Sequence, residues 1–520
     1  MSALHELDVL IVGAGLSGIG CAYHLQDKCP GKSYTILESK ESFGGTWHTH
    51  RYPGARSDSD LFTYGFNFRP WKGHPIAERS LILDYLKDTV DECGIRDNIR
   101  FNHCVRSASW DDATQRWTLT VHRTDTDEVE TFVARYLWMC QGYYRHNQSY
   151  TPDWDGMETY KGDVVHPQFW PEDYDYSGKK VVVIGSGATA ATVVPAMAKT
   201  AAHVTMLQRS PTYFFSEDNR NELAERLRAL DVPEEWTHEI VRRDMLAFQK
   251  EVATRAFEEP QALRDELMEG VRAELGPDCS VDVDTHFNPR YMPWRQRLAF
   301  VPDGDLFAAI REERASVVTD EIDRFVENGI LLKSGEVLEA DLIVTATGFN
   351  LCILGDIDFE INGQPLDFSQ TTTYMGMMYS GVPNLAWVFG YLRTSWTMRL
   401  DLIGDFFTKL INHMDETGAG VCTPTLRPED QGMKETPFLD PEGFNPGYIM
   451  RGLHLLPKQG DKAPWFFKQD YYWEAEAIPA MDLEDGTLAY APKVENQNEA
   501  DGHRDQASAF VPTSAAAMRS

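Results

Sequence analysis

The sequence has few of the features that mark secreted, membrane-spanning or metal-binding proteins. Its eight cysteines in 520 residues include no C-x-x-C pair and no His/Cys cluster with metal-ligand spacing. We therefore expect reduced, mostly buried thiols in a cytoplasmic protein, and no metal site. No apolar run reaches the roughly 18 residues of a membrane span, and no basic segment precedes the first apolar run, so no signal peptide is predicted.

Basic side chains are also scarce. Lysine and arginine number 49 against 80 aspartates and glutamates, a formal net charge of −31. Nucleic acids and anionic membranes attract basic surfaces, so neither is an expected partner. The length predicts about two or three domains.

Glycine, in contrast, is concentrated in two turns, the first within "LDVLIVGAGLSGIGCAYHLQ". A short apolar strand is followed by Gly13, Gly15 and Gly18 in the G-x-G-x-x-G spacing and then by a helix-forming run. Phosphates bind well at such a helix N-terminus, which presents free N–H groups. The next strand ends in Glu38, whose carboxylate can hold both ribose hydroxyls and repels a 2′-phosphate. This turn therefore predicts a site for FAD or NAD.

The second turn lies in "KKVVVIGSGATAATVVPAMAK", where Gly185, Gly187 and Ala190 fill G-x-G-x-x-A. Its following strand ends in Arg209 and Ser210 instead of an acid. A guanidinium and a hydroxyl suit the extra phosphate of NADPH, although Arg209 could instead be a solvated loop charge. The chain thus combines two dinucleotide sites of opposite character, as a flavoprotein reduced by NADPH requires.

These elements predict an α/β protein with two Rossmann-like dinucleotide-binding domains, one for FAD and one for NADPH. Residues about 216–290 carry helical apolar spacing and form a predicted helical insertion in the NADPH domain. The predicted order is the first part of the FAD domain at 1–150, a linker at 151–178, the NADPH domain at 179–350, the second part of the FAD domain at 351–492 and a mobile tail at 493–520.

The predicted linker carries "YKGDVVHPQFWP", in which Tyr160, Gly162, His166, Trp170 and Pro171 follow the pattern aromatic-x-G-x-x-x-H-x-x-x-W-P. This pattern resembles the fingerprint of class B flavoprotein monooxygenases of the Baeyer–Villiger type, with Tyr in place of the usual Phe. Related N- and S-oxidising enzymes lack the Trp-Pro ending. Between two moving domains, His166 is either a hinge and cofactor-orienting residue or an ordinary hydrogen-bonded interdomain histidine.

Two further blocks, "GGTWHTHRYPGARSDSD" and "PWRQRLAF", resemble the ethionamide-activating subgroup of these monooxygenases. The resemblance covers about residues 7–475. It implies FAD contacts from Gly45, Thr46, Trp47, Asp58 and Val105.

The resemblance also implies a catalytic Arg297, since a permanently charged guanidinium can stabilise anionic oxygen. Asp58 matches the carboxylate that orients this arginine. Asp60, two residues later, is the alternative candidate for this role. Many relatives have lysine before the arginine, where this chain has Gln296. The 2′-phosphate of NADPH would then depend more on Arg209 and Ser210.

The implied reaction is NADPH-dependent insertion of one atom of O2 next to a ketone carbonyl, giving an ester or lactone, with sulfoxidation of thioethers as a further activity. The alternatives are a mainly S- or N-oxygenating monooxygenase, a thiol-disulfide reductase and a non-catalytic flavoprotein. The reductase is disfavoured because no redox-active cysteine pair is evident near the flavin. Four residues lie in segments that could face the substrate cavity but could equally be core: Met292, Trp294, Tyr391 and Trp396.

Overall fold

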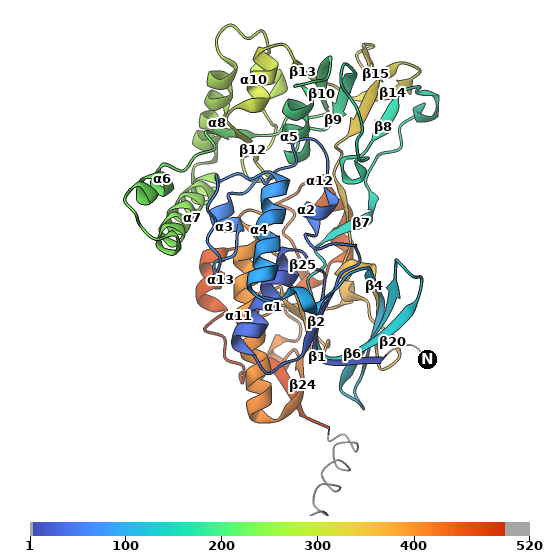
Figure 1. Ribbon diagram of the computed structural model, residues 1–520, viewed down its shortest axis with the longest axis vertical. Helices are drawn as coiled ribbons and strands as arrows, with labels where there is room; N and C mark the ends of the chain where they lie inside the picture. Colours follow the sequence, from blue (N-terminus) through green and yellow to red (C-terminus); the bar gives the residue numbers. More distant parts are fainter. Residues whose placement is uncertain (1–3, 495–520) are drawn as a thin grey trace, which may run out of the picture.

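The structure is a computed structural model that describes residues 4–494. Its two domains lie one above the other in Figure 1, with the larger domain below and the smaller above. Apart from its first two residues, the predicted mobile tail at 493–520 lies outside the described residues.

Within residues 4–494, the larger domain is built on a nine-stranded sheet. Its order is β20 (Gln364–Pro365), β19 (Asp358–Ile361), β4 (His103–Asp111), β5 (Arg116–Arg123), β6 (Val129–Met139), β1 (Leu4–Val12), β2 (Tyr34–Leu37) and β3 (Ile99–Arg100), with β23 (Leu385–Trp387) also paired to β6. The strand β1 pairs in parallel with both β2 and β6. The helix α1 (Leu16–Lys28) follows β1 directly and packs beside the long α11 (Trp396–Thr417), so the first glycine turn lies at the carboxyl edge of parallel strands.

The smaller domain has a five-stranded sheet in the described chain, and all of its pairings are parallel. The order is β13 (Ala315–Thr319), β10 (His203–Gln208), β9 (Lys180–Ile184), β17 (Leu342–Thr345) and β8 (Asp163–Val165). The helices α5 (Ala188–Met197) and α10 (Asp305–Arg311) cover it. Together the two sheets confirm the predicted fold class. The edge strand β8 lies inside the predicted linker, so part of that segment belongs to this sheet.

The predicted insertion contains α6 (Glu222–Ala229), α7 (Glu234–Glu258), α8 (Pro260–Leu275) and α9 (Val283–His286). The helix α8 packs on the smaller domain, whereas α7 contributes Val241 to the core of the larger domain. On α7, the buried Arg242 donates hydrogen bonds to the carbonyl oxygens of Phe62 and Thr63, at 2.9 and 3.1 Å. The insertion therefore bridges the two domains, as the position of α7 beside α3 (Leu61–Tyr64) in Figure 1 shows.

The chain crosses between the domains twice through one two-stranded ribbon. The strand β7 (Tyr144–Ser149) leaves the larger domain, β18 (Phe349–Leu351) returns to it, and the two pair in antiparallel fashion with Ser149 opposite Phe349. The domain boundaries predicted near 150 and 350 fall on this ribbon.

The remaining elements complete the two domains. They are α2 (Thr46–Thr49), α4 (Arg79–Glu92), β11 (Phe214–Glu217), β12 (Ala299–Pro302), β14 (Ile322–Val326), β15 (Gly329–Leu332), β16 (Val337–Glu339), β21 (Thr373–Tyr374), β22 (Met378–Tyr379), β24 (Ala419–Pro424), β25 (Thr436–Pro437), α12 (Gly447–Gly452), β26 (Lys458–Gln459), α13 (Tyr471–Ala477) and β27 (Leu488–Pro492), with short 3₁₀ turns between them. Among the described helices, none combines the length and apolarity that crossing a membrane needs.

Candidate active site

The first glycine turn forms a backbone cradle at the start of α1. A Cβ atom on Gly18 would lie 1.9 Å from the carbonyl oxygen of Gly13, so only glycine allows α1 to approach β1 this closely. Gly15 caps α1, and a Cβ atom on Gly45 would lie 3.1 Å from the Cα atom of Gly15. Two glycine backbones thus face each other beside the free N–H groups of α1, an arrangement that fits a pyrophosphate.

Glu38 stands at the carboxyl end of β2, as the sequence predicts for a ribose-binding acid. Its carboxylate accepts hydrogen bonds from the backbone N–H groups of Ala14 (2.8 Å) and Lys40 (2.9 Å). Burial raises the pKa of Glu38, and these donors oppose the rise. The buried Val105 lies on β4, the strand whose first residue, His103, hydrogen-bonds to the Glu38 carbonyl. Both residues fit the adenosine end of FAD.

The segment after Gly45 forms the short helix α2, which carries Thr46 and Trp47. The indole of Trp47 is buried and donates to the Tyr64 hydroxyl at 3.1 Å. Gly45 has φ = 54°, in the left-handed region that favours glycine. This turn brings α2 against the cradle and places both residues beside the nucleotide site.

The second glycine turn is open where a ligand would lie. Gly185 has φ = 134°, and a Cβ atom there would lie 2.4 Å from the carbonyl oxygen of Ala346. Apart from Gly187 itself and its chain neighbours, no described residue has an atom within 4 Å of a Cβ position on Gly187, which caps α5, while Ala190 is buried in the core. The N-terminus of α5 is therefore free to receive a second pyrophosphate.

Arg209 and Ser210 follow β10 and are both exposed. Arg209 has no ion-pair partner among residues 4–494. Its guanidinium is thus available to a 2′-phosphate at the edge of the second site.

The two predicted catalytic residues meet between the domains. Arg297 Nη2 donates a hydrogen bond to Asp58 Oδ1 at 2.9 Å, and Arg297 Nε lies 2.7 Å from Asp58 Oδ2, so the ion pair has two close N–O contacts. Arg297 also donates to the Ser59 hydroxyl (3.0 Å) and to the carbonyl of Leu392 (3.2 Å). Arg297 lies two residues before β12 of the smaller domain, whereas Asp58 lies in a loop of the larger domain. This ion pair therefore forms only when the domains are in contact.

Asp60, the rival of Asp58, has a structural role. Its carboxylate caps α3 by accepting from the backbone N–H and the hydroxyl of Thr63, at 2.9 and 2.6 Å, and it also accepts from Gln249 at 2.8 Å. Burial raises its pKa, and its carboxylate contacts Thr63 and Gln249, whereas Arg297 pairs with Asp58.

Three tyrosines line the site beside Arg297, and the sequence analysis missed them. The hydroxyls of Tyr143 and Tyr144 lie 2.7 Å apart, and the ring centroid of Tyr448 lies 6.1 Å from that of Tyr144. Burial lowers the pKa of Arg297, but Asp58 and the three phenols raise it above its usual range. Tyr143 and Tyr144 directly follow Gly142 in the turn after β6, a position from which they could have been proposed as site residues.

His166 is held by backbone groups on both ring nitrogens. Its Nδ1 accepts from the N–H of Gln168 at 3.1 Å, and its Nε2 lies 3.2 Å from the carbonyl oxygen of Gly348, to which it donates as the Nε2–H tautomer. Burial lowers the pKa of His166 to about 4. The neutral ring therefore joins the fingerprint segment to the return crossing of the ribbon and has no free nitrogen for proton transfer.

Four residues were predicted to line the substrate cavity or to belong to the core, and the structure places them differently. Tyr391 is core, because its buried hydroxyl donates to Glu474 at 2.7 Å. Trp396 stacks on Tyr143 with 5.3 Å between ring centroids and thus borders the site. Met292 and Trp294 are partly buried in the Arg297 loop, where Trp294 has φ = 63°, a strained conformation for a tryptophan.

Two of the cysteines lie close together near the first glycine turn. Cys21 of α1 and Cys140 at the end of β6 place their Sγ atoms 3.6 Å apart, directly behind the first glycine turn. Both thiols are buried, and burial followed by the contact with Cys140 raises the pKa of Cys21. A buried thiol of raised pKa is a poor nucleophile, so the pair does not support a thiol-disulfide reductase.

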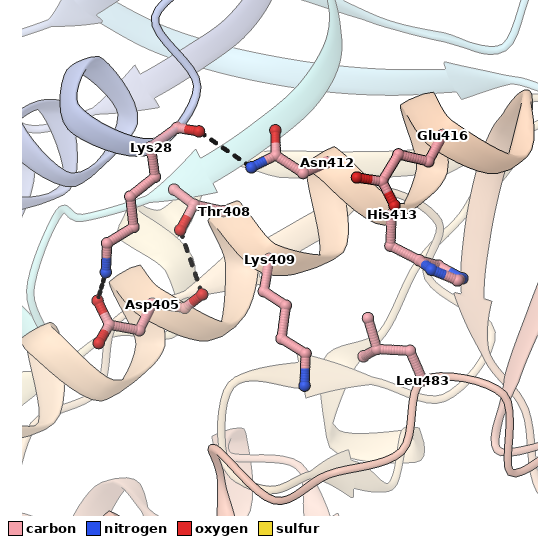
Figure 2. Close-up of a pocket in the computed structure, with 8 residues that line it drawn as sticks. All are labelled: Lys28, Asp405, Thr408, Lys409, Asn412, His413, Glu416 and Leu483. Carbon is pink, nitrogen blue, oxygen red and sulfur yellow. Dashed lines mark hydrogen bonds and ion pairs between the residues drawn. The ribbon is translucent and has the colours of Figure 1, made fainter.

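A surface pocket of about 570 Å³ lies away from these residues, between the end of α1 and α11. Figure 2 shows that its polar side chains pair with one another: Lys28 contacts Asp405, and Asn412 donates to the Lys28 carbonyl at 2.9 Å. Neither the two glycine turns nor the Arg297–Asp58 pair lines this pocket. The pocket is therefore separate from the candidate active site at the domain interface.

Comparisons with known proteins identify relatives of this chain. Residues 66–222 match the model of the flavin-binding monooxygenase-like family, and residues 11–76 match that of an NAD(P)-binding Rossmann-like domain. The chain is 46% identical over 490 residues to the FAD-containing monooxygenase EthA of Mycobacterium tuberculosis, covering 94% of this chain and 98% of that protein.

Two solved structures share the fold. A steroid monooxygenase bound to NADP aligns with a TM-score of 0.71 at 24% identity, over 94% of this chain and 100% of its own. An open cyclohexanone monooxygenase aligns with a TM-score of 0.66 at 23% identity, over 82% of this chain and 91% of its own.

Proposed function

The chain belongs to the EthA-type FAD-containing monooxygenases, and from this we propose that it inserts one oxygen atom of O2 next to the carbonyl of a ketone, giving an ester or a lactone. The family predicted from the sequence motifs is thereby confirmed, as is the use of FAD and NADPH. The observation that supports the oxygenation site best is the bidentate ion pair between Arg297 and Asp58 at the domain interface.

The residues present fit FAD in the larger domain and NADPH in the smaller. Gly13, Gly15 and Gly45 would hold the FAD pyrophosphate, and Glu38 its ribose. Gly187 would lie under the NADPH pyrophosphate. When bound, FAD supplies activated oxygen after NADPH has reduced it.

Arg297 stabilises the negative charge that develops on oxygen during the attack on the carbonyl. Its guanidinium cannot give up a proton at any working pH, and the Asp58 carboxylate fixes its orientation. The side chain is about a third exposed (36%), and Tyr143 and Tyr448 lie near it, so the guanidinium is partly shielded from water. The aromatic lining suits an apolar ketone, and a thioether of similar size would fit the same surface.

The test measures NADPH oxidation and product formation with 2-octanone, cyclohexanone, acetophenone and thioanisole. We expect ester or lactone from at least one ketone and sulfoxide from thioanisole. The Arg297→Ala variant should keep NADPH-dependent flavin reduction and lose ketone oxygenation by at least about 100-fold. Ester formation at the wild-type rate by this variant would contradict the role of Arg297, and sulfoxide alone would favour the S-oxygenating alternative.

A further inference from the structure

A second ion pair joins the two domains beside the catalytic one. Arg56 donates from Nη1 to Asp305 Oδ2 at 2.5 Å and from Nη2 to Asp305 Oδ1 at 3.1 Å. The Arg56 side chain is 14% exposed, so this bidentate contact is shielded from water more than an ordinary surface pair. Arg56 lies two residues before Asp58 in the larger domain, and Asp305 is the first residue of α10 in the smaller domain.

The two pairs have opposite polarity across the interface. The larger domain contributes the cation Arg56 and the anion Asp58, and the smaller domain contributes the anion Asp305 and the cation Arg297. Separation of the domains breaks both pairs. The arrangement therefore fixes the register of the two domains as well as their distance.

The loop that carries Arg56 has its backbone fixed in the larger domain. Ser57 exchanges hydrogen bonds with Ala77: its N–H donates to the Ala77 carbonyl at 2.9 Å, and its hydroxyl accepts from the Ala77 N–H at 3.2 Å. On its other side the loop touches α5, since a Cβ atom on Gly54 would lie 3.0 Å from the Thr192 carbonyl oxygen. Replacing the Arg56 side chain should thus leave the loop in place and remove a polar link to the smaller domain.

We infer that Arg56 and Asp305 are positioning residues whose ion pair holds the domains in the arrangement that brings Arg297 onto Asp58. The inference rests on the proposed function, because the arrangement matters only if oxygen must be delivered in a closed site. Without the pair, water enters and NADPH oxidation ends in hydrogen peroxide (NADPH + H⁺ + O2 → NADP⁺ + H2O2) in place of ester.

The experiment uses full-length, FAD-loaded Arg56→Ala, Asp305→Ala and the charge-swapped R56D/D305R. The first readout is ester formed per NADPH oxidised, with whichever ketone of the panel above the wild type oxygenates. The second is the Kd for NADP⁺, measured from the change in flavin absorbance. Arg311→Ala is the matched control, since Arg311 lies on the same helix and pairs with Glu274 inside the smaller domain.

Each single variant should lower the ester yield per NADPH by about 10-fold or more and weaken NADP⁺ binding, because small displacements of reacting groups cost this much. The charge-swapped variant should recover to within about threefold of the wild type if the pair acts as a unit. The inference would be overturned if both single variants behaved as the wild type, or if the loss in the charge-swapped variant were as large as the sum of the two single losses.

If Arg56→Ala fails to fold, Arg56→Lys, which loses the bidentate contact, should show a smaller loss on both readouts. No loss in this variant would count against the inference. If the wild type oxygenates no ketone, the proposed function fails, while NADP⁺ binding still tests the ion pair.

Discussion

The stability of the larger domain should depend on the protonation of His24. This residue of α1 is buried between two carboxylates of α11, with Nε2 3.1 Å from Asp401 Oδ1 and Nδ1 3.1 Å from Asp405 Oδ1. Burial lowers the pKa of His24, but the two aspartates raise it more, from 6.5 to about 9. Lys28 and Arg242 also face these carboxylates, so the cluster contains three cations and two anions when His24 is protonated.

The raised pKa corresponds to about 3 kcal/mol of stabilisation of the folded state, which is fully present below pH 6.5. A group whose pKa is higher in the folded protein loses its contribution as the pH rises. The contribution of His24 should therefore decline from about pH 6.5, fall to about 1 kcal/mol near pH 8 and vanish above pH 9.

The measurement compares wild type with His24→Gln, which keeps a polar side chain that does not titrate. Urea titrations at pH 6, 7, 8, 9 and 10 give the free energy of unfolding for the transition in which flavin is released. We expect the difference between the two proteins to change by about 3 kcal/mol across this range, in favour of wild type at low pH. His122→Gln, at a partly exposed position near the end of β5, is the control. A difference that stays constant from pH 6 to pH 10 would show that His24 is not held as an imidazolium.

Three further variants test other parts of the structure. Gly18→Ala should yield protein without FAD, visible in the ratio of flavin to protein absorbance, because its Cβ atom would lie 1.9 Å from the Gly13 carbonyl oxygen. Arg399→Met should lower the free energy of unfolding by about 3–5 kcal/mol, because it leaves the buried Glu474 carboxylate without its partner at 2.8 Å; thermal unfolding checks this. Arg209→Ala should raise the KM for NADPH by about 10-fold or more and leave that for NADH unchanged, if its guanidinium binds the 2′-phosphate.

The parts of the site that could be predicted are those in which local sequence fixes local geometry. In the first glycine turn, Gly18 is required by its backbone contact with Gly13, five residues earlier, and Glu38 directly follows the strand next to β1. The Arg297–Asp58 pair joins residues 239 apart in the chain, and only the family resemblance, not the pattern of residues, connected them.

The missed parts depend on packing between distant segments. Tyr448 reaches the site because α12 lies against the crossing ribbon, about 300 residues after Tyr143 and Tyr144. Tyr391 could have faced the cavity until the position of Glu474 was known, and Arg56 carried no signal without Asp305. Apolar and charged residues are common in both cores and sites, so their roles follow from tertiary contacts that periodicity does not encode.

The paired crossing strands β7 and β18 make the smaller domain an insert whose two ends are neighbours. Ser149 and Phe349 lie opposite each other, so a foreign segment of similar span could be joined at this point without stretching the host. Chimaeras that exchange residues 150–348 between relatives should accordingly inherit their nicotinamide preference from the donor and their flavin from the recipient. The same exchange would let the preferences for the two cofactors evolve separately.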